Sequence, residues 1–168
     1  MAYNSKAIAN YFLDLAKESD QSLTPMKLQK LIYFAHGWSL AIYDQALISE
    51  TVEAWRYGPV VQSIYHEFKE YGSGAITKLA TEFELLDADE LEFGISTPHI
   101  NDDDEKTKAL LNKVWDIYGK YSGVALSNST HMQNTPWAKV WNPNTPKGTD
   151  IPEIEIKQYF QSIAAKNN

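Results

Sequence analysis

The four histidines are the residues of this chain best suited to catalysis or metal binding, because imidazole titrates near neutral pH and binds transition metals. They are His36, His66, His99 and His131. None has the spacing of an H-E-x-x-H zinc motif on one helix face. The sequence also contains no cysteine, which excludes thiolate nucleophiles and zinc sites built on Cys. We therefore expect neither a metal nor a cofactor.

The surroundings of the histidines favour structural roles over catalysis. His36 lies in an apolar stretch and is expected to be a hydrogen-bonded core residue, whereas His66, beside Glu67, is expected at the surface. A small hydrolase or transferase would need His36 or His131 within hydrogen-bond distance of a carboxylate. The acidic run 102–105 is typical of a helix N-terminus and needs no cation. An enzyme is thus the weaker alternative, and no residue is assigned a catalytic role.

The segment 53–60, EAWRYGPV, joins aromatic and basic side chains at a predicted change of structure. Gly58 breaks an extended stretch, and Pro59 suits the first position of a helix, since its fixed φ fits and its missing N–H needs no partner. The N–H groups of a helix start point outward and can receive a carboxylate or a peptide. The residues of this segment that we expect to bind a partner are Trp55, Arg56, Tyr57, Gly58 and Pro59.

The segment 129–137, STHMQNTPW, is a polar junction between two predicted helices and brings His131 close to Trp137 in the sequence. If it meets the segment 53–60 beside the central helix, the two form an aromatic and polar surface of the kind that anchors another protein. We therefore add His131 and Trp137 to the expected partner-binding residues. The alternative interpretation is that these side chains are buried polar groups that hold helix ends together.

The net charge and the composition of the chain argue against nucleic acids and membranes as partners. The chain has 168 residues, which fits a single domain over 1–168, and a net charge of −7. Its sole arginine is Arg56, so it lacks the clustered basic residues that bind nucleic acid phosphates. The longest fully apolar run in the central segment, 31–35, is far shorter than the roughly 20 residues of a membrane span. No secretory signal is visible, and the expected location is the cytoplasm.

These side chains need a framework, and the sequence predicts one built around a buried helix at about 24–43. Thr24 is a typical N-cap residue, and Pro25 suits the first helical position. The segment is apolar on nearly all sides, as in a helix that several neighbours touch, and Gly37 would let one of them approach closely. The apolar positions that share one face are Leu28, Leu31, Ile32, Ala35 and Ile42.

The remaining segments predict a mainly α fold, a compact helical bundle around the central helix. Apolar periodicity and capping residues place further helices at about 5–17, 59–72, 101–119, 122–130, 135–142 and 152–165. A small hairpin or extended excursion is expected near 46–56. Alternation of apolar with acidic or small residues predicts a second hairpin within 81–95.

Four stretches of the chain occur in the same order in a known family. They are MKLQKLIYFAHGW at 26–38, EAWRYGPVVQSIYHEFKEYG at 53–72, the segment 126–137 with THMQNTPW, and a closing helix with Tyr159-Phe160. On these residues the chain resembles the Panacea antitoxin domain, also described as SocA-like or as phage-associated GepA-type proteins. The segment 73–101 has no counterpart in this resemblance.

The resemblance implies a mainly helical bacterial or prophage domain that neutralises a cognate protein toxin, encoded beside it, by direct protein contact. Delivery of the toxin to a cytoplasmic protease is the alternative that the same resemblance implies. Signals of ordered structure extend along almost the whole chain, so we expect neutralisation to need the entire domain and not a disordered tail.

Overall fold

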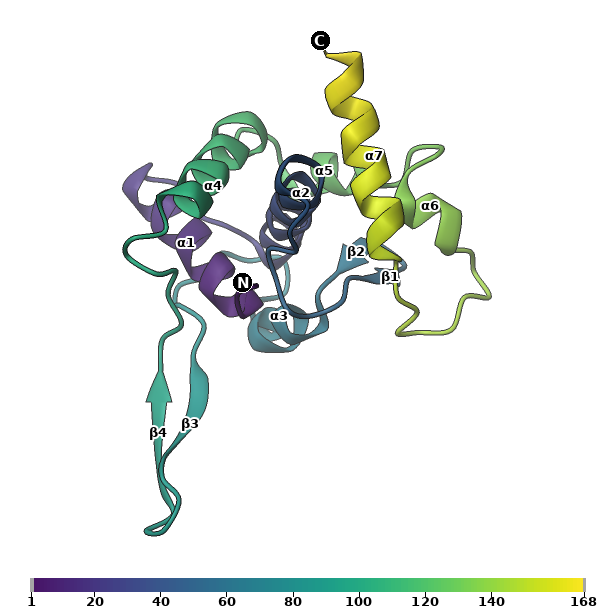
Figure 1. Ribbon diagram of the computed structural model, residues 1–168. Helices are drawn as coiled ribbons and strands as arrows, with labels where there is room; N and C mark the ends of the chain where they lie inside the picture. Colours follow the sequence, from purple (N-terminus) through teal and green to yellow (C-terminus); the bar gives the residue numbers. More distant parts are fainter. Residues whose placement is uncertain (1, 168) are drawn as a thin grey trace.

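Helix α2 (Pro25–Tyr43) lies at the centre of the computed structural model, which describes residues 2–167 (Figure 1). The Thr24 side chain caps it by accepting a hydrogen bond from the Lys27 N–H, and Pro25 occupies its first turn. Every residue from Leu28 to Gly37 is buried, so other elements surround this part of the helix. The predicted helix over about 24–43 is confirmed and its middle is buried, but Ile42, expected on the shared apolar face, is 57% exposed.

Five helices pack against α2. They are α1 (Ser5–Glu18), α3 (Gln62–Phe68), α4 (Glu105–Tyr118), α5 (Gly123–Thr130) and α7 (Glu153–Lys166). The shortest α-helix, α6 (Pro136–Val140), packs on α5 and α7. At the crossing of α2 and α7, a Cβ on Gly37 would lie 2.2 Å from the ring of Phe160, so only glycine permits this approach. The predicted close contact at Gly37 is therefore present, and the fold is mainly helical as expected.

Side chains cap the helices where the sequence predicted helix starts. In each case an oxygen of the capping side chain accepts a hydrogen bond from an N–H in the first turn, which would otherwise lack a partner. These residues are Asn4 for α1, Asp104 for α4, Ser122 for α5 and Thr135 for α6. After α3 the chain forms a short 3₁₀ helix, η1 (Lys69–Tyr71), and ends it at Gly72 with a φ of 58°.

Gly58 and Pro59 lie in a strand, and the prediction that they begin a helix is wrong. Strand β1 (Glu53–Trp55) pairs antiparallel with β2 (Gly58–Val60), and α3 begins only at Gln62. The cause is a contact with a residue distant in the sequence, which local sequence patterns do not reveal. Gln29 in α2 accepts a hydrogen bond from the Val61 N–H at 2.9 Å and donates one to the Val61 carbonyl at 3.0 Å, which keeps this backbone extended.

The second predicted hairpin is present and projects away from the helices (Figure 1). It consists of β3 (Glu82–Asp87) and β4 (Glu92–Ser96), paired antiparallel with Phe83 opposite Ile95 and Leu85 opposite Phe93. Its position agrees with the expectation of a hairpin within 81–95. Within the described residues 2–167, no helix has both the length and the apolar character required to cross a membrane.

Candidate partner-binding surface

The two segments that the sequence singled out lie against each other beside α2. The indole Nε1 of Trp137, in α6, donates a hydrogen bond of 2.6 Å to the backbone carbonyl of Trp55, in β1. The hydroxyl of Ser127, in α5, donates one of 2.7 Å to the carbonyl of Tyr57, in the turn between β1 and β2. Helix α5 contacts both α2 and β2. The conditional expectation that the segments meet beside the central helix is met.

Three rings are stacked at the junction of α5 and α6. The imidazole of His131 lies parallel to the indole of Trp137, with ring centroids 4.0 Å apart and an interplanar angle of 11°. The indole of Trp141 stacks on Trp137 with centroids 4.9 Å apart. Trp137 is only 7% exposed, so it acts mainly as a buried link between the junction and β1, as the alternative interpretation held.

The turn between β1 and β2 presents its side chains to solvent. Arg56 is exposed, Tyr57 is 60% exposed, and the guanidinium lies 5.5 Å from the centre of the tyrosine ring. Trp55 is half-buried and its ring packs 4.7 Å from that of Tyr65 in α3, with the ammonium of Lys147 5.0 Å from the indole. We refer to these five side chains as the aromatic–basic surface.

Gly58 and Pro59 are buried beneath the exposed side chains of this surface. Gly58 has a φ of 116°, a backbone conformation that other residues rarely adopt. A Cβ there would lie 2.9 Å from both the Lys30 Cε and the Thr130 Oγ1. The glycine therefore lets the turn pack tightly on α2 and α5.

A cavity of about 460 Å³ opens beside the aromatic–basic surface. Its wall includes the five side chains of that surface together with Met26 and Lys30 of α2. Three of the lining residues are basic, whereas none is an aspartate or a glutamate. This is a local concentration of positive charge in a chain whose net charge is −7.

Lys30 is a buried cation whose only hydrogen bond among the described residues goes to a carbonyl. Its Nζ donates to the Pro59 oxygen at 3.1 Å, and no ion pair with a carboxylate is formed within residues 2–167. Burial of the amine lowers the pKa of Lys30 to about 7. Near neutral pH the residue is therefore poised between its charged and neutral forms.

His131 carries an unsatisfied nitrogen. Its Nε2 is buried and makes no hydrogen bond within the described part of the chain. Burial lowers the pKa of His131, the backbone of Tyr57 opposes this change, and the charge of Lys30 adds to it. The neutral ring can stack on Trp137 without carrying a charge into the junction.

The other histidines show no catalytic arrangement. The Nδ1 of His36 accepts a hydrogen bond from the Leu47 N–H at 3.3 Å, and burial lowers the pKa of His36 to about 4, as befits a structural core residue. His66 and His99 are exposed. Within residues 2–167 no hydrogen bond or ion pair joins a histidine to a carboxylate, and no cluster of three metal-ligating side chains occurs. The geometry required for a His/carboxylate hydrolase thus receives no support.

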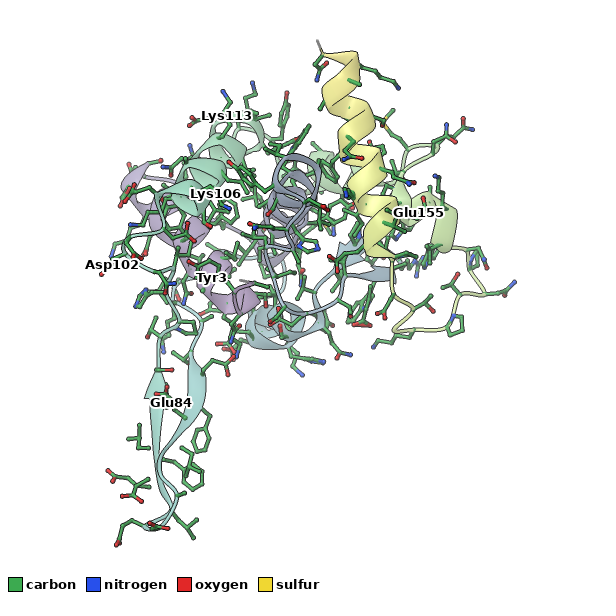
Figure 2. The ribbon with its side chains drawn as sticks, viewed as in Figure 1. Tyr3, Glu84, Asp102, Lys106, Lys113 and Glu155 are labelled. Atoms are coloured by element: carbon green, nitrogen blue, oxygen red, sulfur yellow. The ribbon has the colours of Figure 1, made fainter. Side chains whose placement is uncertain are left out.

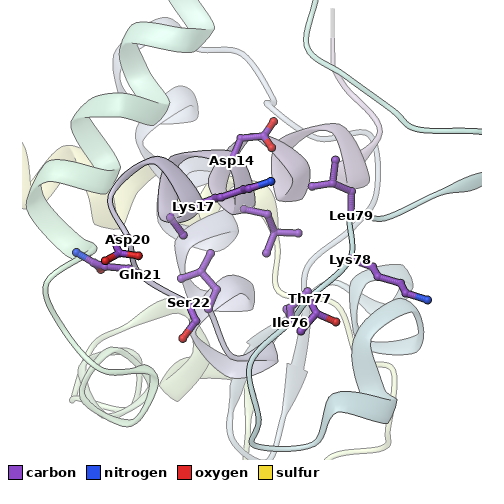
Figure 3. A pocket seen from close by; sticks show the side chains of 12 residues that line it. Asp14, Lys17, Asp20, Gln21, Ser22, Ile76, Thr77, Lys78 and Leu79 are labelled. Atoms are coloured by element: carbon purple, nitrogen blue, oxygen red, sulfur yellow. The ribbon is translucent and has the colours of Figure 1, made fainter.

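A second cavity, of about 410 Å³, lies between the end of α1 and the segment 76–79 (Figure 3). Its wall contains Asp14, Lys17 and Lys78, a mixture of charges without a histidine. None of the seven residues predicted to bind a partner lines it. By contrast, Trp55, Arg56 and Tyr57 all line the cavity beside the aromatic–basic surface.

Sequence reasoning missed Lys30, Tyr65 and Lys147 as parts of this surface. An available signal for Lys30 was its place in a helix that the sequence predicted to be buried, because lysine is seldom fully buried. Lys147 lies in the loop between α6 and α7, where only the tertiary fold brings it to Trp55.

Comparisons with known proteins agree with the resemblance seen in the sequence. The chain matches the family model "Antitoxin SocA-like, Panacea domain" over residues 28–138, from the first turn of α2 to α6. It is 32% identical over 161 residues to "Antitoxin SocA" of Caulobacter vibrioides (strain NA1000 / CB15N), an alignment that covers 94% of this chain and 82% of that protein. No solved structure matches. On the extent of these two matches, the chain belongs to the SocA-like antitoxin family with a Panacea domain.

Proposed function

We propose that this protein is an antitoxin that neutralises a cognate protein toxin by binding it directly through the aromatic–basic surface. The observation that carries the proposal is the convergence of the segments 53–60 and 129–137 on one face, in a chain of an antitoxin family. Tryptophan, tyrosine and arginine are the residue types that dominate binding energy at protein interfaces. In this assignment Trp55, Arg56 and Tyr57 contact the toxin, whereas Gly58, Pro59, His131 and Trp137 hold them in place.

The charges of the cavity indicate which part of a toxin would enter it. Lys30, Arg56 and Lys147 line it without an acidic neighbour in the wall, and the walls are otherwise largely aromatic and apolar. An acidic side chain or terminal carboxylate flanked by apolar residues fits this combination. A carboxylate near Lys30 would raise the pKa of its amine again, so binding at pH 8 would take up a proton.

The proposed activity needs no chemical step and belongs in the cytoplasm, where a toxin encoded beside the antitoxin would be made. The unit of function is the whole domain, 1–168, because helices from both ends of the chain, α1 and α7, pack on the same central helix as the surface. Neutralisation is thus a property of the folded body.

The test is to co-express this chain with the protein encoded beside its gene and to measure colony survival, then the affinity of the purified pair. Arg56→Ala with Tyr57→Ala is expected to weaken binding at least about 30-fold, the loss typical of an interface hot spot. Both side chains are exposed, so the unfolding temperature should hardly change.

The matched control is Tyr43→Ala, which removes another tyrosine that lies against a cation, 4.7 Å from Lys106, at the far end of α2. It should neutralise as the wild type does. Equal survival with the Arg56/Tyr57 variant and the wild type would refute the assigned surface, and a neighbour that is not toxic would refute the function. The half-life of the toxin in the same cells separates binding alone from delivery to a protease.

A further inference from the structure

The hairpin of β3 and β4, which we call the arm (82–96), has one apolar face that the described chain leaves uncovered. The strand register puts Phe83 opposite Ile95 and Leu85 opposite Phe93 on the same face, and the rings of Phe83 and Phe93 stack 5.1 Å apart. These four side chains are between 51% and 73% exposed. A clean apolar face of this kind is normally packed against a core.

The opposite face of the arm is mainly polar. Glu82 and Glu84 alternate with the apolar residues of β3, and Leu86 covers Gly94, where a Cβ would lie 2.8 Å from its Cδ1. Figure 2 shows Glu84 on the projecting ribbon, remote from the helices. The arm is thus amphipathic, with its apolar side turned to water in the free protein.

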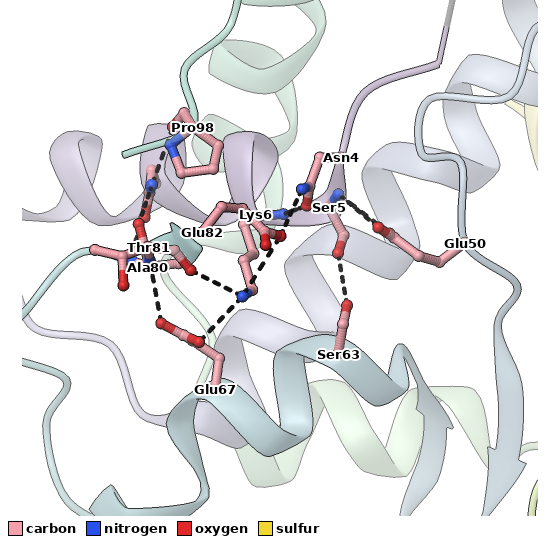
Figure 4. Close-up of polar contacts among 11 residues, drawn as sticks. Asn4, Ser5, Lys6, Glu50, Ser63, Glu67, Ala80, Thr81, Glu82 and Pro98 are labelled. Atoms are coloured by element: carbon pink, nitrogen blue, oxygen red, sulfur yellow. Dashed lines mark hydrogen bonds and ion pairs between the residues drawn. The ribbon is translucent and has the colours of Figure 1, made fainter. Parts of the chain in front are cut away.

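The base of the arm is fixed to the body by polar contacts (Figure 4). The ammonium of Lys6 lies 3.5 Å from Glu82 and 3.2 Å from Glu67, and Asn4 donates a hydrogen bond of 2.7 Å to Glu82. The N–H of Thr81 donates to Glu67 at 3.1 Å. The arm is therefore held in a defined direction at its base, although it receives little support along its length.

The negative charge of the arm favours a basic protein as the partner that covers its apolar face. Residues 82–96 contain no lysine, arginine or histidine, whereas their acidic residues are Glu82, Glu84, Asp87, Asp89, Glu90 and Glu92. A second copy packed on the apolar face would add an equal set of carboxylates to the same assembly, and like charges oppose that association. A basic partner gains attraction from the same charges.

We propose that the arm is a second docking element, which inserts its apolar face into a hydrophobic groove of the toxin bordered by lysines and arginines. This rests on the proposed function, but it concerns a surface separate from the aromatic–basic one. The apolar face of the arm predicts an apolar floor of the groove, and the acidic residues of the arm predict positive charges at its rim.

The experiment compares the wild type with Phe83→Ser/Phe93→Ser in binding to the purified toxin. The double variant should lose at least about 10-fold in affinity, since two large apolar anchors are removed, while the unfolding temperature stays the same because both rings are exposed. Glu84→Lys/Glu92→Lys should mainly slow association and weaken its salt dependence, because the arm keeps only part of its negative charge. Ile42→Ser/Ile154→Ser, which alters two exposed apolar residues outside the arm, should bind normally.

Three outcomes overturn the proposal. If the wild type binds the toxin and the Phe83/Phe93 variant binds it with the same affinity, the arm has no role in docking, whereas the proposed function stands. If the wild type does not bind the toxin, both the proposed function and the docking role of the arm are refuted. A wild-type dimer in light scattering that the same variant dissociates would show that a second copy covers the arm instead.

Discussion

The buried amine of Lys30 makes a single hydrogen bond within the described residues, to the Pro59 carbonyl, and burial holds its pKa near 7, below the ordinary value of 10.5. Between these two values the unfolded chain binds one proton more than the folded chain at this residue, so folding stability rises with pH across that window. Below pH 7 both states are protonated, and the penalty for burying the charge is largest. The residue thus reduces the stability of the fold at neutral pH.

Lys30→Met is expected to raise the free energy of unfolding at pH 7 by about 1–3 kcal/mol, because removal of the buried charge outweighs loss of the hydrogen bond to Pro59. The increase should shrink towards pH 10, where the wild-type penalty has largely vanished. Urea unfolding at both pH values measures this, with the exposed Lys113→Met as control. A less stable Lys30→Met variant would mean that the amine stabilises the fold. The same substitution should weaken toxin binding if a carboxylate approaches Lys30.

At the scale of elements, the crossing of α2 and α7 depends on Gly37. Gly37→Ala places a methyl group 2.2 Å from the Phe160 ring, which forces the two helices apart or the ring out of its position. We expect a loss of about 1–3 kcal/mol in the free energy of unfolding, as is usual for an overpacked core. Thermal and urea unfolding measure this loss. Adding Phe160→Leu should restore part of it, and the absence of any rescue would place the strain elsewhere.

The helices and the arm were predictable because their signals are local. Thr24, Ser122 and Thr135 mark helix starts through the atoms that cap them, and the alternation in 81–95 marks a hairpin. The strand at Gly58 was not predictable, since a long-range contact from Gln29 overrides the local preference for a helix at Pro59.

Prediction of the candidate site had the same limit. The sequence identified Trp55 and Trp137 as notable residues, but it could not tell that one is half-exposed and the other is a buried link. Burial of each depends on the docking of α6 against β1, to which segments more than eighty residues apart contribute. Lys147 joined the surface through the fold alone.

At the scale of the whole molecule, the aromatic–basic surface depends on elements such as α7 that contribute no residue to it. Deletion of 153–168 removes Ile156 and Phe160, both fully buried, from the core around α2. We expect the shortened chain to unfold and to lose neutralisation, although every residue of the aromatic–basic surface remains. Circular dichroism and survival of cells producing the toxin measure the two effects. Neutralisation by the shortened chain, or by a peptide from either end, would show that the folded body is dispensable.

The hydrogen bond between Trp137 and Trp55 also has a consequence for the order of events during synthesis. A ribosome completes the β1–β2 turn long before it makes α6, and it makes the core residues of α7 later still. In a growing chain the aromatic–basic surface therefore lacks the support of α6 and α7 until both have been made. If the protein acts as proposed, protection against a toxin would therefore begin only after α7 has been made and has folded.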